Sequence, residues 1–307
     1  MTKIFTFWEP RGALVPYLAL CMKTWERALH AYDVVVLDYQ NLPQYLEDGA
    51  LDLETLRRLR LSMQKDAVMV AVLHRHGGIF LDADTLAVAD IAPLLAFLDH
   101  GEAVSFNMHV ACIAARPGAH LLDRWLGHIR RRLAAVRQHD GGPPNVPWSY
   151  LGNDCLYAAM DDIIDAHEGT PFPLAAAERA LGLGRPQIPP DGRRSLRARL
   201  LNGMLWRRRL FYFRTIHRKR LTMLERNRFA FMPERLYRPR EAGTDEVRYR
   251  RYWFESNAGV DTAVREGQML IGLHNSYTPD WYKRLSEAEV LAHPCLLSRT
   301  LRRLLDR

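Results

Sequence analysis

The sequence has few cysteines and no long hydrophobic stretch. Four cysteines occur among the 307 residues, far apart and without a C-x-x-C pair, at Cys21, Cys112, Cys155 and Cys295. We therefore expect neither a zinc knuckle nor a disulfide framework, but the reduced thiols of a cytosolic protein. No apolar run reaches the roughly 18 residues of a membrane-spanning helix, and residues 1–10 lack the apolar stretch of a signal peptide. The sequence predicts a cytoplasmic protein that is neither secreted by that route nor threaded through a bilayer.

The composition shows no strong bias toward any class of residue. Hydrophobic residues make up 48% and charged residues 25%, with 19 Gly and 17 Pro, and these values lie near globular averages. This composition excludes collagen and low-complexity fibres and argues against disorder. At this length the chain can bury a real core, as one large domain or two fused ones.

Acidic residues are missing from one segment, residues 193–220. It holds eleven Arg or Lys residues and no Asp or Glu, whereas the rest of the chain has 32 basic and 35 acidic residues. The net charge of +8 therefore belongs to this one segment. Apolar residues, Trp206 and Tyr212 are interleaved with the arginines, so a helix here would be cationic and amphipathic, suited to an anionic membrane surface. No helix-turn-helix, zinc or RRM signature accompanies it, so we expect no nucleic-acid partner; a solvated helix face is the plain alternative.

The first eighty residues predict a parallel α/β sheet. Residues 3–8 have the composition of a strand, the apolar spacing after Pro16 is that of an amphipathic helix, and residues 33–38 have the pattern of a strand buried on both faces. Strand, helix and strand in this order favour parallel pairing. Residues 53–76 are helical in pattern, and Gly77-Gly78 stands where a helix C-cap favours glycine.

The rest of the chain continues the alternation of strands and helices. We predict strands at residues 103–106, 110–115 and 269–273, and helices at 119–136, from about 154, and at the C-terminus. Segments 140–144 and 171–190 are rich in Gly and Pro, which indicates irregular connections.

The strongest candidate for a site is the pair Asp82 and Asp84. It follows a short apolar strand at residues 79–81, so both carboxylates are expected at the carboxyl edge of the sheet, where open α/β folds bind ligands. Asp66, on the preceding helix, is expected close to the same edge. Paired carboxylates favour Mg²⁺ or Mn²⁺, which often also binds a substrate diphosphate. Asp-x-Asp alone is a weak signal, since it also occurs in solvated turns.

The run Gly77-Gly78-Ile79-Phe80-Leu81-Asp82-Ala83-Asp84, with Asp66 upstream, resembles the DXD region of retaining glycosyltransferases. The pattern is similar to that of glycosyltransferase family 32 and the capsular polysaccharide synthesis proteins. The likeness covers residues 3–84 well, extends loosely to 154 and is absent from the basic segment. These families usually have Arg three residues after the first Asp, where this chain has Met69. The neighbouring Lys65 is the cation that would replace it.

This resemblance implies a GT-A fold, a Rossmann-like sheet that binds a nucleotide sugar. Residues 1–190 would form the GT-A core, 191–228 a helical basic insertion, and 229–307 the completion of the core with a C-terminal helix. The resemblance assigns Asp82 and Asp84 to catalysis with a bound Mn²⁺ or Mg²⁺, and His274 to the metal as well. A UDP-sugar is the favoured donor.

Further substrate-binding residues follow from the same resemblance. Asp66, with Lys65 and Gly78, would bind the donor sugar. Ser276 and Trp281 would close over the diphosphate after the last strand, where an indole N–H can donate to a phosphate oxygen.

Three other positions have two interpretations each. Trp8 either stacks on the nucleotide base or packs in the core. Asn153 and Asp154 begin a helix, and Asp154 either caps that helix or faces the acceptor hydroxyl as a catalytic residue, with Asn153 binding substrate. Apart from the resemblance, His274 would be an ordinary strand-end histidine satisfied by backbone groups.

The implied function is a retaining, metal-dependent transfer of a sugar from a nucleotide sugar to a growing cell-surface glycan, whether capsular, exopolysaccharide or lipid-linked. No covalent protein nucleophile is evident, so we expect front-face attack by the acceptor, with metal and positioned donors stabilising the leaving diphosphate. The enzyme would act in the cytoplasm, peripherally on the inner face of the cell membrane, with residues 193–220 on anionic lipid.

Two alternatives stand beside this function. Residues 79–85 also resemble the first motif of haloacid dehalogenase-type phosphatases, with Asp82 as nucleophile and Asp84 as acid/base. Their last acidic motif would be imitated by Asp161, Asp162 and Asp165. Against this, the motif normally opens such a domain, and no lysine occurs between residues 84 and 161. The second alternative is a non-enzymatic membrane-surface adaptor that uses the Arg-rich helix.

Overall fold

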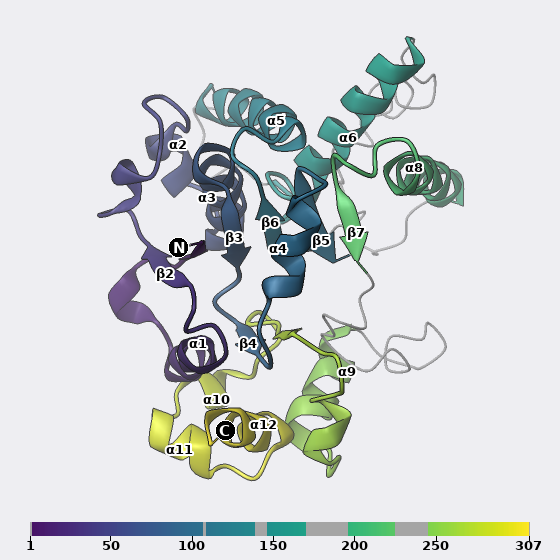
Figure 1. Ribbon diagram of the computed structural model, residues 1–307. Coiled ribbons are helices and arrows are strands. Elements are labelled where there is room, and N and C mark those ends of the chain that lie inside the picture. The colour runs from purple at the N-terminus through teal and green to yellow at the C-terminus, as the bar shows by residue number, and fades with distance from the viewer. Residues whose placement is uncertain (1, 107–108, 139–145, 170–195, 225–244, 307) are drawn as a thin grey trace. The chain divides into compact units, whose positions relative to one another are not determined.

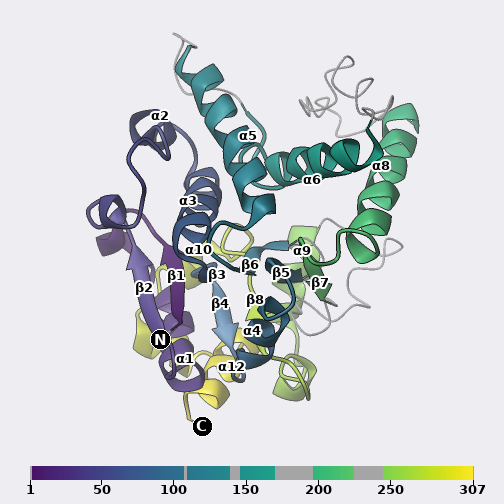
Figure 2. The same cartoon turned by 45° about the horizontal axis from the view of Figure 1, so that its top comes forward.

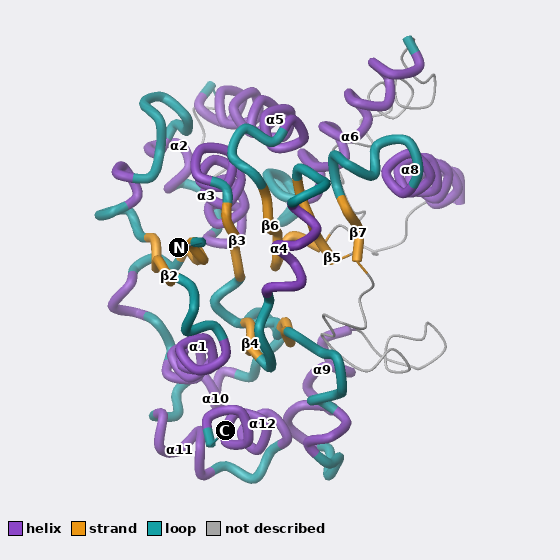
Figure 3. Tube along the Cα trace, viewed as in Figure 1, coloured by secondary structure: helices purple, strands orange, loops and turns teal. Residues whose placement is uncertain are grey.

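The computed structural model describes residues 2–106, 109–138, 146–169, 196–224 and 245–306 (Figure 1). These residues form a mixed α/β protein, whose helices and strands are distinguished in Figure 3. The chain divides into two compact units, each assembled from separate segments. Unit 1 takes its residues from 1–39, 79–96 and 224–307, and unit 2 from 40–78 and 97–223. No helix within the described ranges is long and apolar enough to cross a membrane.

Unit 1 contains three parallel strands with β1 in the middle. Strand β1 (Lys3–Phe7) is followed by helix α1 (Pro16–Ala28) and strand β2 (Asp33–Leu37), which pairs parallel to β1. Strand β3 (Gly78–Leu81) pairs parallel to β1 on the other side, with Ile4 opposite Ile79. The predicted strand, helix and strand with parallel pairing are confirmed.

Strand β2 is less buried than its sequence predicts. Asp33 is exposed, the three valines are half-buried and only Leu37 is buried. The expectation of a strand buried on both faces is therefore wrong. The reason is its position at the end of the strand order, where β1 is its one described neighbour.

The rest of unit 1 is a two-stranded sheet packed with helices. Strand β4 (Thr85–Ala87) pairs antiparallel with β8 (Leu270–Gly272). Helix α1 packs on β4, where Trp25 Nε1 donates to the Thr85 carbonyl at 2.7 Å, and also on α11 (Glu287–Ala292) and α12 (Leu296–Leu305). Fully buried side chains at the centre of this core include Tyr17, Leu18, Trp253, Tyr282, Leu297 and Leu301.

Unit 2 is mainly helical. Helix α5 (His120–Arg137) packs on α3 (Leu61–His76) and on α6 (Asn153–Glu168), and α6 packs on α8 (Leu196–Arg214). Figure 2 shows α6 between α5 and α8. Strands β5 (Ala103–Phe106) and β6 (His109–Ala115) pair antiparallel, and β7 (Thr222–Leu224) lies next to β5. The strands and helices predicted for residues 103–136 are confirmed.

The single helix expected over residues 53–76 is two helices. Helix α2 (Leu53–Arg57) begins at its N-cap Asp52, and the chain then breaks before α3. Gln64 Nε2 donates to the Leu59 carbonyl at 2.7 Å, and so satisfies a buried backbone acceptor at the break between the two helices. The helical spacing of hydrophobic residues continues through this break, so the sequence pattern does not reveal the break.

Glycine ends α3 as the sequence predicts. Gly77 has φ +65°, which disfavours other residues, and a Cβ there would lie 2.6 Å from Pro117 Cδ. Its amide donates to the Leu73 carbonyl at 2.8 Å. The chain can therefore turn directly from α3 into β3, and this turn places the acidic pair at the far end of that strand.

The remaining described α-helices are α4 (Ala92–Leu98), α9 (Asp245–Arg250) and α10 (Asp280–Lys283). The expected helix within the basic segment is confirmed as α8, and the C-terminal helix as α12. The expected connections at 140–144 and 171–190 lie outside the described residues.

Candidate functional site

The acidic pair lies in the turn between two strands of unit 1. Asp82 follows the last residue of β3, and Asp84 directly precedes Thr85, the first residue of β4. The Thr85 amide donates to the Asp82 carbonyl at 3.0 Å, so the turn is tight. Both carboxylates are half-buried while Ala83 between them is buried. The predicted position at the carboxyl end of a parallel strand is confirmed.

Asp84 is held by the segment that follows β8. Its Oδ2 accepts a hydrogen bond from the Asn275 amide at 2.7 Å, and its carbonyl accepts one from the Leu273 amide at 2.9 Å. The side chain of Asn275 is fixed in turn, because its Oδ1 accepts from the Tyr17 hydroxyl at 2.7 Å. Tyr17 is a fully buried residue of α1. The segment after β8 and helix α1 together thus determine the orientation of this carboxylate.

His274 occupies the same segment, beside Asn275. Its amide donates to the Tyr249 hydroxyl at 3.2 Å, and its carbonyl accepts from the Thr278 amide at 3.0 Å. The imidazole is half-buried and packs against the rings of Tyr249 and Tyr277, at centroid distances of 5.6 and 4.9 Å. These bonds satisfy the His274 backbone, and two aromatic rings pack against its imidazole. Whether His274 is a metal ligand or an ordinary strand-end histidine stays a prediction.

The negative charge of Asp84 raises the pKa values of buried groups around it. Burial raises the pKa of the Tyr17 hydroxyl well above its ordinary value, and the Asp84 carboxylate raises it further. Burial and then Asp84 act in the same direction on the pKa of the Cys21 thiol. Burial also raises the pKa of Tyr249, with a smaller contribution from Asp84. These neighbours therefore stay protonated and neutral beside the carboxylate.

The donor chemistry of this turn suits a hard divalent cation. Two carboxylates and an imidazole are ligand types that Mg²⁺ or Mn²⁺ accepts, with oxygen preferred. Within the described part of the chain, no three His, Cys, Asp or Glu side chains form a group that could hold a metal ion. A cation on Asp82 and Asp84 would therefore take further ligands from substrate or water oxygens.

Trp8, Ser276 and Trp281 also belong to unit 1. Trp8 follows β1 and packs with its half-buried ring against the core cluster; its Nε1 is buried and has no hydrogen-bond partner among the residues described. Ser276 is exposed directly after Asn275. Trp281 lies on α10, is 40% exposed, and packs on the rings of Phe254 and His293. Core contact is thus present for Trp8, and its base stacking stays a prediction.

A second group of expected residues comes together in unit 2. Asp66 is buried on α3, with Lys65 Nζ 2.7 Å from its Oδ1. Gly152, just before α6, lies so close that an added Cβ would overlap the Asp66 carboxylate and lie 2.9 Å from its Cγ. Asn153 and Asp154 are the first two residues of that helix. The structure therefore brings Lys65 and Asp66 to the start of α6, and glycine permits the approach.

Asp154 does not cap its helix. The N-cap is Gly152, with no side-chain cap, while the Asp154 amide donates to the Ser149 carbonyl at 3.1 Å. The Asp154 carboxylate lies 3.8 Å from Arg132 Nη1. The capping interpretation is wrong because the helix begins at Asn153, two residues earlier than an N-cap at Asp154 would require. A role toward an acceptor stays a prediction, as does substrate binding by Asn153, whose Nδ2 donates to the Tyr157 hydroxyl at 3.4 Å.

Three positions near the resemblance motif have clear structural roles. Met69, where related patterns have Arg, is fully buried in α3. Gly78 begins β3 with φ +95°, a conformation that side chains disfavour. Lys65 is engaged with Asp66, so the cation expected to replace the missing Arg binds the acid directly.

Sequence reasoning missed the residues that orient Asp84. For Asn275 the sequence does contain a signal, because it is a polar residue next to His274 at a strand end. Tyr17 gave none, since its spacing marks only a buried helix face. The sequence also gives no signal for the role of Gly152, because glycine is common before a helix and Asp66 is far from it in sequence.

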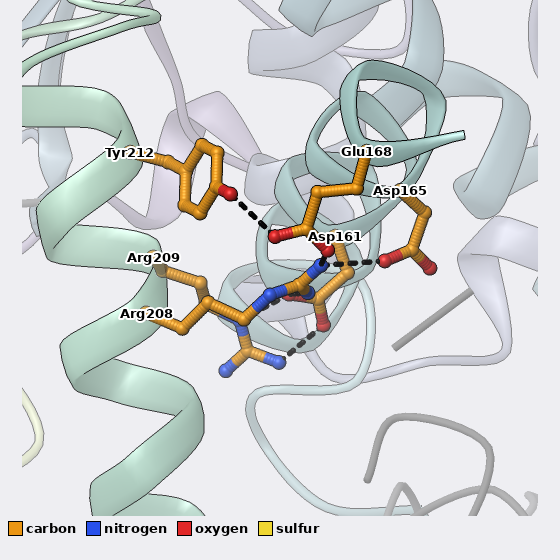
Figure 4. A network of polar contacts seen from close by, with 6 residues as sticks. All are labelled: Asp161, Asp165, Glu168, Arg208, Arg209 and Tyr212. Carbon is orange, nitrogen blue, oxygen red and sulfur yellow. Dashed lines mark hydrogen bonds and ion pairs between the residues drawn. The ribbon is translucent and has the colours of Figure 1, made fainter. Parts of the chain in front are cut away.

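The acids that imitate a phosphatase motif lie on α6 and pair with residues of α5 and α8; Figure 4 shows Asp161 and Asp165 with the arginines of α8. The pairs are Asp161 with Arg209 at 2.5 Å, Asp162 with His128 at 2.8 Å, and Asp165 with Arg208 at 2.8 Å. Carboxylates held in this way stabilise helix packing, which counts against their use as a metal site.

Comparison with known proteins assigns no family to the chain. No protein-family model matches the sequence, and no characterised protein matches it in sequence either. Among solved structures, a chain titled "PaToxG Glycosyltransferase" aligns with a TM-score of 0.34 and 13% identity, covering 67% of this chain and 85% of that one. The functional argument rests on the site geometry.

Proposed function

We propose that the protein is a metal-dependent glycosyltransferase with a nucleotide-sugar donor. The observation that carries this proposal is the hydrogen bond from the Asn275 amide to Asp84 at the end of a parallel strand. A backbone amide is neutral, so this hydrogen bond orients the carboxylate without itself cancelling the negative charge. Asp82, two residues upstream, supplies a second carboxylate at the same strand exit.

A divalent cation bound at this turn would supply positive charge to the leaving diphosphate. In this proposal Asp82 and Asp84 hold the cation, and His274 assists them. Asn275 and Tyr17 fix the position of Asp84 through the two hydrogen bonds described above. Ser276 and Trp281 are assigned to the diphosphate, and Trp8 to the base.

We assign the unit 2 group to hydroxyl recognition. The carboxylates of Asp66 and Asp154 accept hydrogen bonds from sugar or acceptor hydroxyls, with Lys65, Gly78 and Asn153 supporting the donor. UDP-sugars are the favoured donors, and the acceptor is a cell-surface or lipid-linked glycan. Retention without a covalent protein nucleophile is supported by the resemblance of residues 77–84. Trapping a glycosyl-enzyme adduct would contradict front-face attack.

The test is release of free nucleotide by purified protein from UDP, GDP, dTDP and CMP sugars, with Mn²⁺ or with EDTA. We expect turnover of one donor that EDTA abolishes. Asp84→Asn should lower this activity at least ~100-fold, because the amide has the carboxylate's shape but lacks its charge.

A matched control is Asp261→Asn, which makes the same change at an exposed acid of unit 1. Asp261 pairs with Arg303 at the surface, and its side chain is 83% exposed, so its loss should leave turnover unchanged. Equal activity of Asp84→Asn and wild type would reject the proposal. Hydrolysis of a phosphate monoester without cleavage of any nucleotide sugar would favour the phosphatase. If the protein cleaves neither class of substrate, with or without metal, and does not bind Mn²⁺, the adaptor is favoured.

A further inference from the structure

Helix α8 has an inner face that packs on α6. Leu205, Arg209 and Phe213, spaced by four residues, are buried. Arg209 donates from Nε and Nη2 to the Asp161 carboxylate, at 2.9 and 2.5 Å. The inner face is therefore part of the fold, although it contains an arginine.

A second arginine of the basic segment is also used internally. Arg208 Nη2 lies 2.8 Å from Asp165 and 2.6 Å from Glu168, whose other oxygen accepts from the Tyr212 hydroxyl (Figure 4). Both of these arginines are thus neutralised by acids of α6. They cannot also supply charge to a partner, so the basic segment is less available than its sequence predicts.

The opposite face of α8 is exposed and mixed in character. Met204, Arg207, Phe211 and Arg214 follow one another at three- and four-residue spacing, which places them on one stripe. Met204 and Phe211 are 55% and 58% exposed. Exposed Ile216, Arg218 and Lys219 follow directly after the helix. We call these seven residues the outer α8 face.

The cations of the outer α8 face have no internal role in the described structure. Its three arginines and Lys219 form no ion pair with any residue that the structure describes, unlike Arg208 and Arg209. Four cations without an ion pair to a described residue are thus interspersed with three large apolar side chains. This combination matches a surface that presents both negative charge and hydrocarbon.

We propose that the outer α8 face binds an anionic phospholipid surface. The guanidinium groups contact the lipid phosphates, and Met204, Phe211 and Ile216 enter the boundary between head groups and acyl chains. A nucleic acid would satisfy the cations but leave the apolar side chains in water, so lipid is the better match.

This inference is independent of the transferase proposal. It concerns α8, and it is measured without nucleotide, metal or acceptor. Failure of vesicle binding would leave donor cleavage untouched, and failure of donor cleavage would leave vesicle binding untouched.

The experiment is flotation of the full chain with vesicles of phosphatidylcholine, with or without roughly one-third phosphatidylglycerol. We expect binding to the anionic vesicles only. Each of Arg207→Gln and Arg214→Gln should lower the partition coefficient about fivefold, and about 25-fold together. Phe211→Gln should lower it about tenfold at unchanged charge.

Arg124→Gln with Arg131→Gln is the matched control. These arginines are exposed on α5 with the same seven-residue spacing, and their loss should leave the partition coefficient nearly unchanged. The proposal is overturned by absence of anionic vesicle binding, by an equal loss in the control, or by wild-type binding of Phe211→Gln. The proposal is also overturned if the protein binds duplex DNA or RNA more strongly than vesicles at the same salt concentration, and if Phe211→Gln does not change that binding. The exposure of all five positions lets the variants fold, which circular dichroism verifies.

Discussion

The carboxylates Asp84 in unit 1 and Asp161 in unit 2 are both fixed in orientation, but by different kinds of donor. A neutral backbone amide holds Asp84, at 2.7 Å. The guanidinium of Arg209 holds Asp161 with two N–H groups. An amide orients a carboxylate and leaves its charge, whereas a guanidinium cancels that charge. The first arrangement suits binding of a cation and the second suits packing of two helices.

The largest expected effect comes from breaking the Arg209 pair. Arg209→Met leaves the buried Asp161 carboxylate with only the Arg208 Nη1 at 4.0 Å among the cations described near it. We expect a loss of about 3 kcal/mol in the free energy of unfolding, measured by urea denaturation. Adding Asp161→Leu should recover much of this loss, because no buried charge then remains. A loss below about 1 kcal/mol would show that the pair is not structural.

A smaller loss is expected where glycine allows a carboxylate to approach. In Gly152→Ala the new Cβ overlaps the Asp66 carboxylate, so either the acid or the start of α6 must move. We expect destabilisation of about 1–3 kcal/mol in urea denaturation. Gly203→Ala is the control: nothing lies within 4 Å of its Cβ, and in a helix it should stabilise by about 0.5–1 kcal/mol. Two variants of similar stability would contradict the close contact.

The positioning of the Asp84 carboxylate can be tested at the Tyr17 hydroxyl, which holds the side chain of Asn275. Tyr17→Phe removes the donor to Asn275 Oδ1 in a buried position. We expect a loss of about 1 kcal/mol in stability and weaker Mn²⁺ binding by titration calorimetry. Tyr32→Phe removes a bond to Asp90 at the surface, so Mn²⁺ binding should not change. If both variants bind Mn²⁺ equally, the bond from Tyr17 to Asn275 does not help to position Asp84.

The smallest expected effect is a pH dependence at the end of α8. Burial, followed by His167 and Arg220, lowers the pKa of the His217 imidazole below 6.5. Well above pH 6.5 the imidazole is neutral in both the folded and the unfolded state. As the pH falls below 6.5, the unfolded chain takes up the proton first, so stability decreases. His217→Gln should flatten this decrease in urea denaturation series; parallel curves for the two proteins would contradict the shift.

The sequence predicts local elements well where one physical signal determines them. Gly77 marked the end of α3 because positive φ requires glycine, and the acidic pair was placed correctly because a strand end fixes where the chain exits. Hydrophobic spacing did not reveal the break between α2 and α3. It could not, since the pattern is continuous and the break is stabilised by one side chain, Gln64.

The sequence identifies individual residues of the candidate site, but not the contacts between them. Asp84 and His274 are visible in the sequence, but the bond from Asn275 joins positions that are 191 residues apart. The same holds for the basic segment, where Arg208 and Arg209 look identical to Arg207 and Arg214. Only the acids of α6, forty or more residues away, separate structural arginines from exposed ones.

The pairing of β4 with β8 has a consequence for the synthesis of the chain. A ribosome completes Asp84 and β4 long before it makes β8 and Asn275, so the newly made strand lacks its partner and the carboxylate lacks its amide donor. Segments of one domain that are distant in sequence must wait for each other during translation. The acidic pair therefore reaches its final orientation only after β8 and Asn275 have been made.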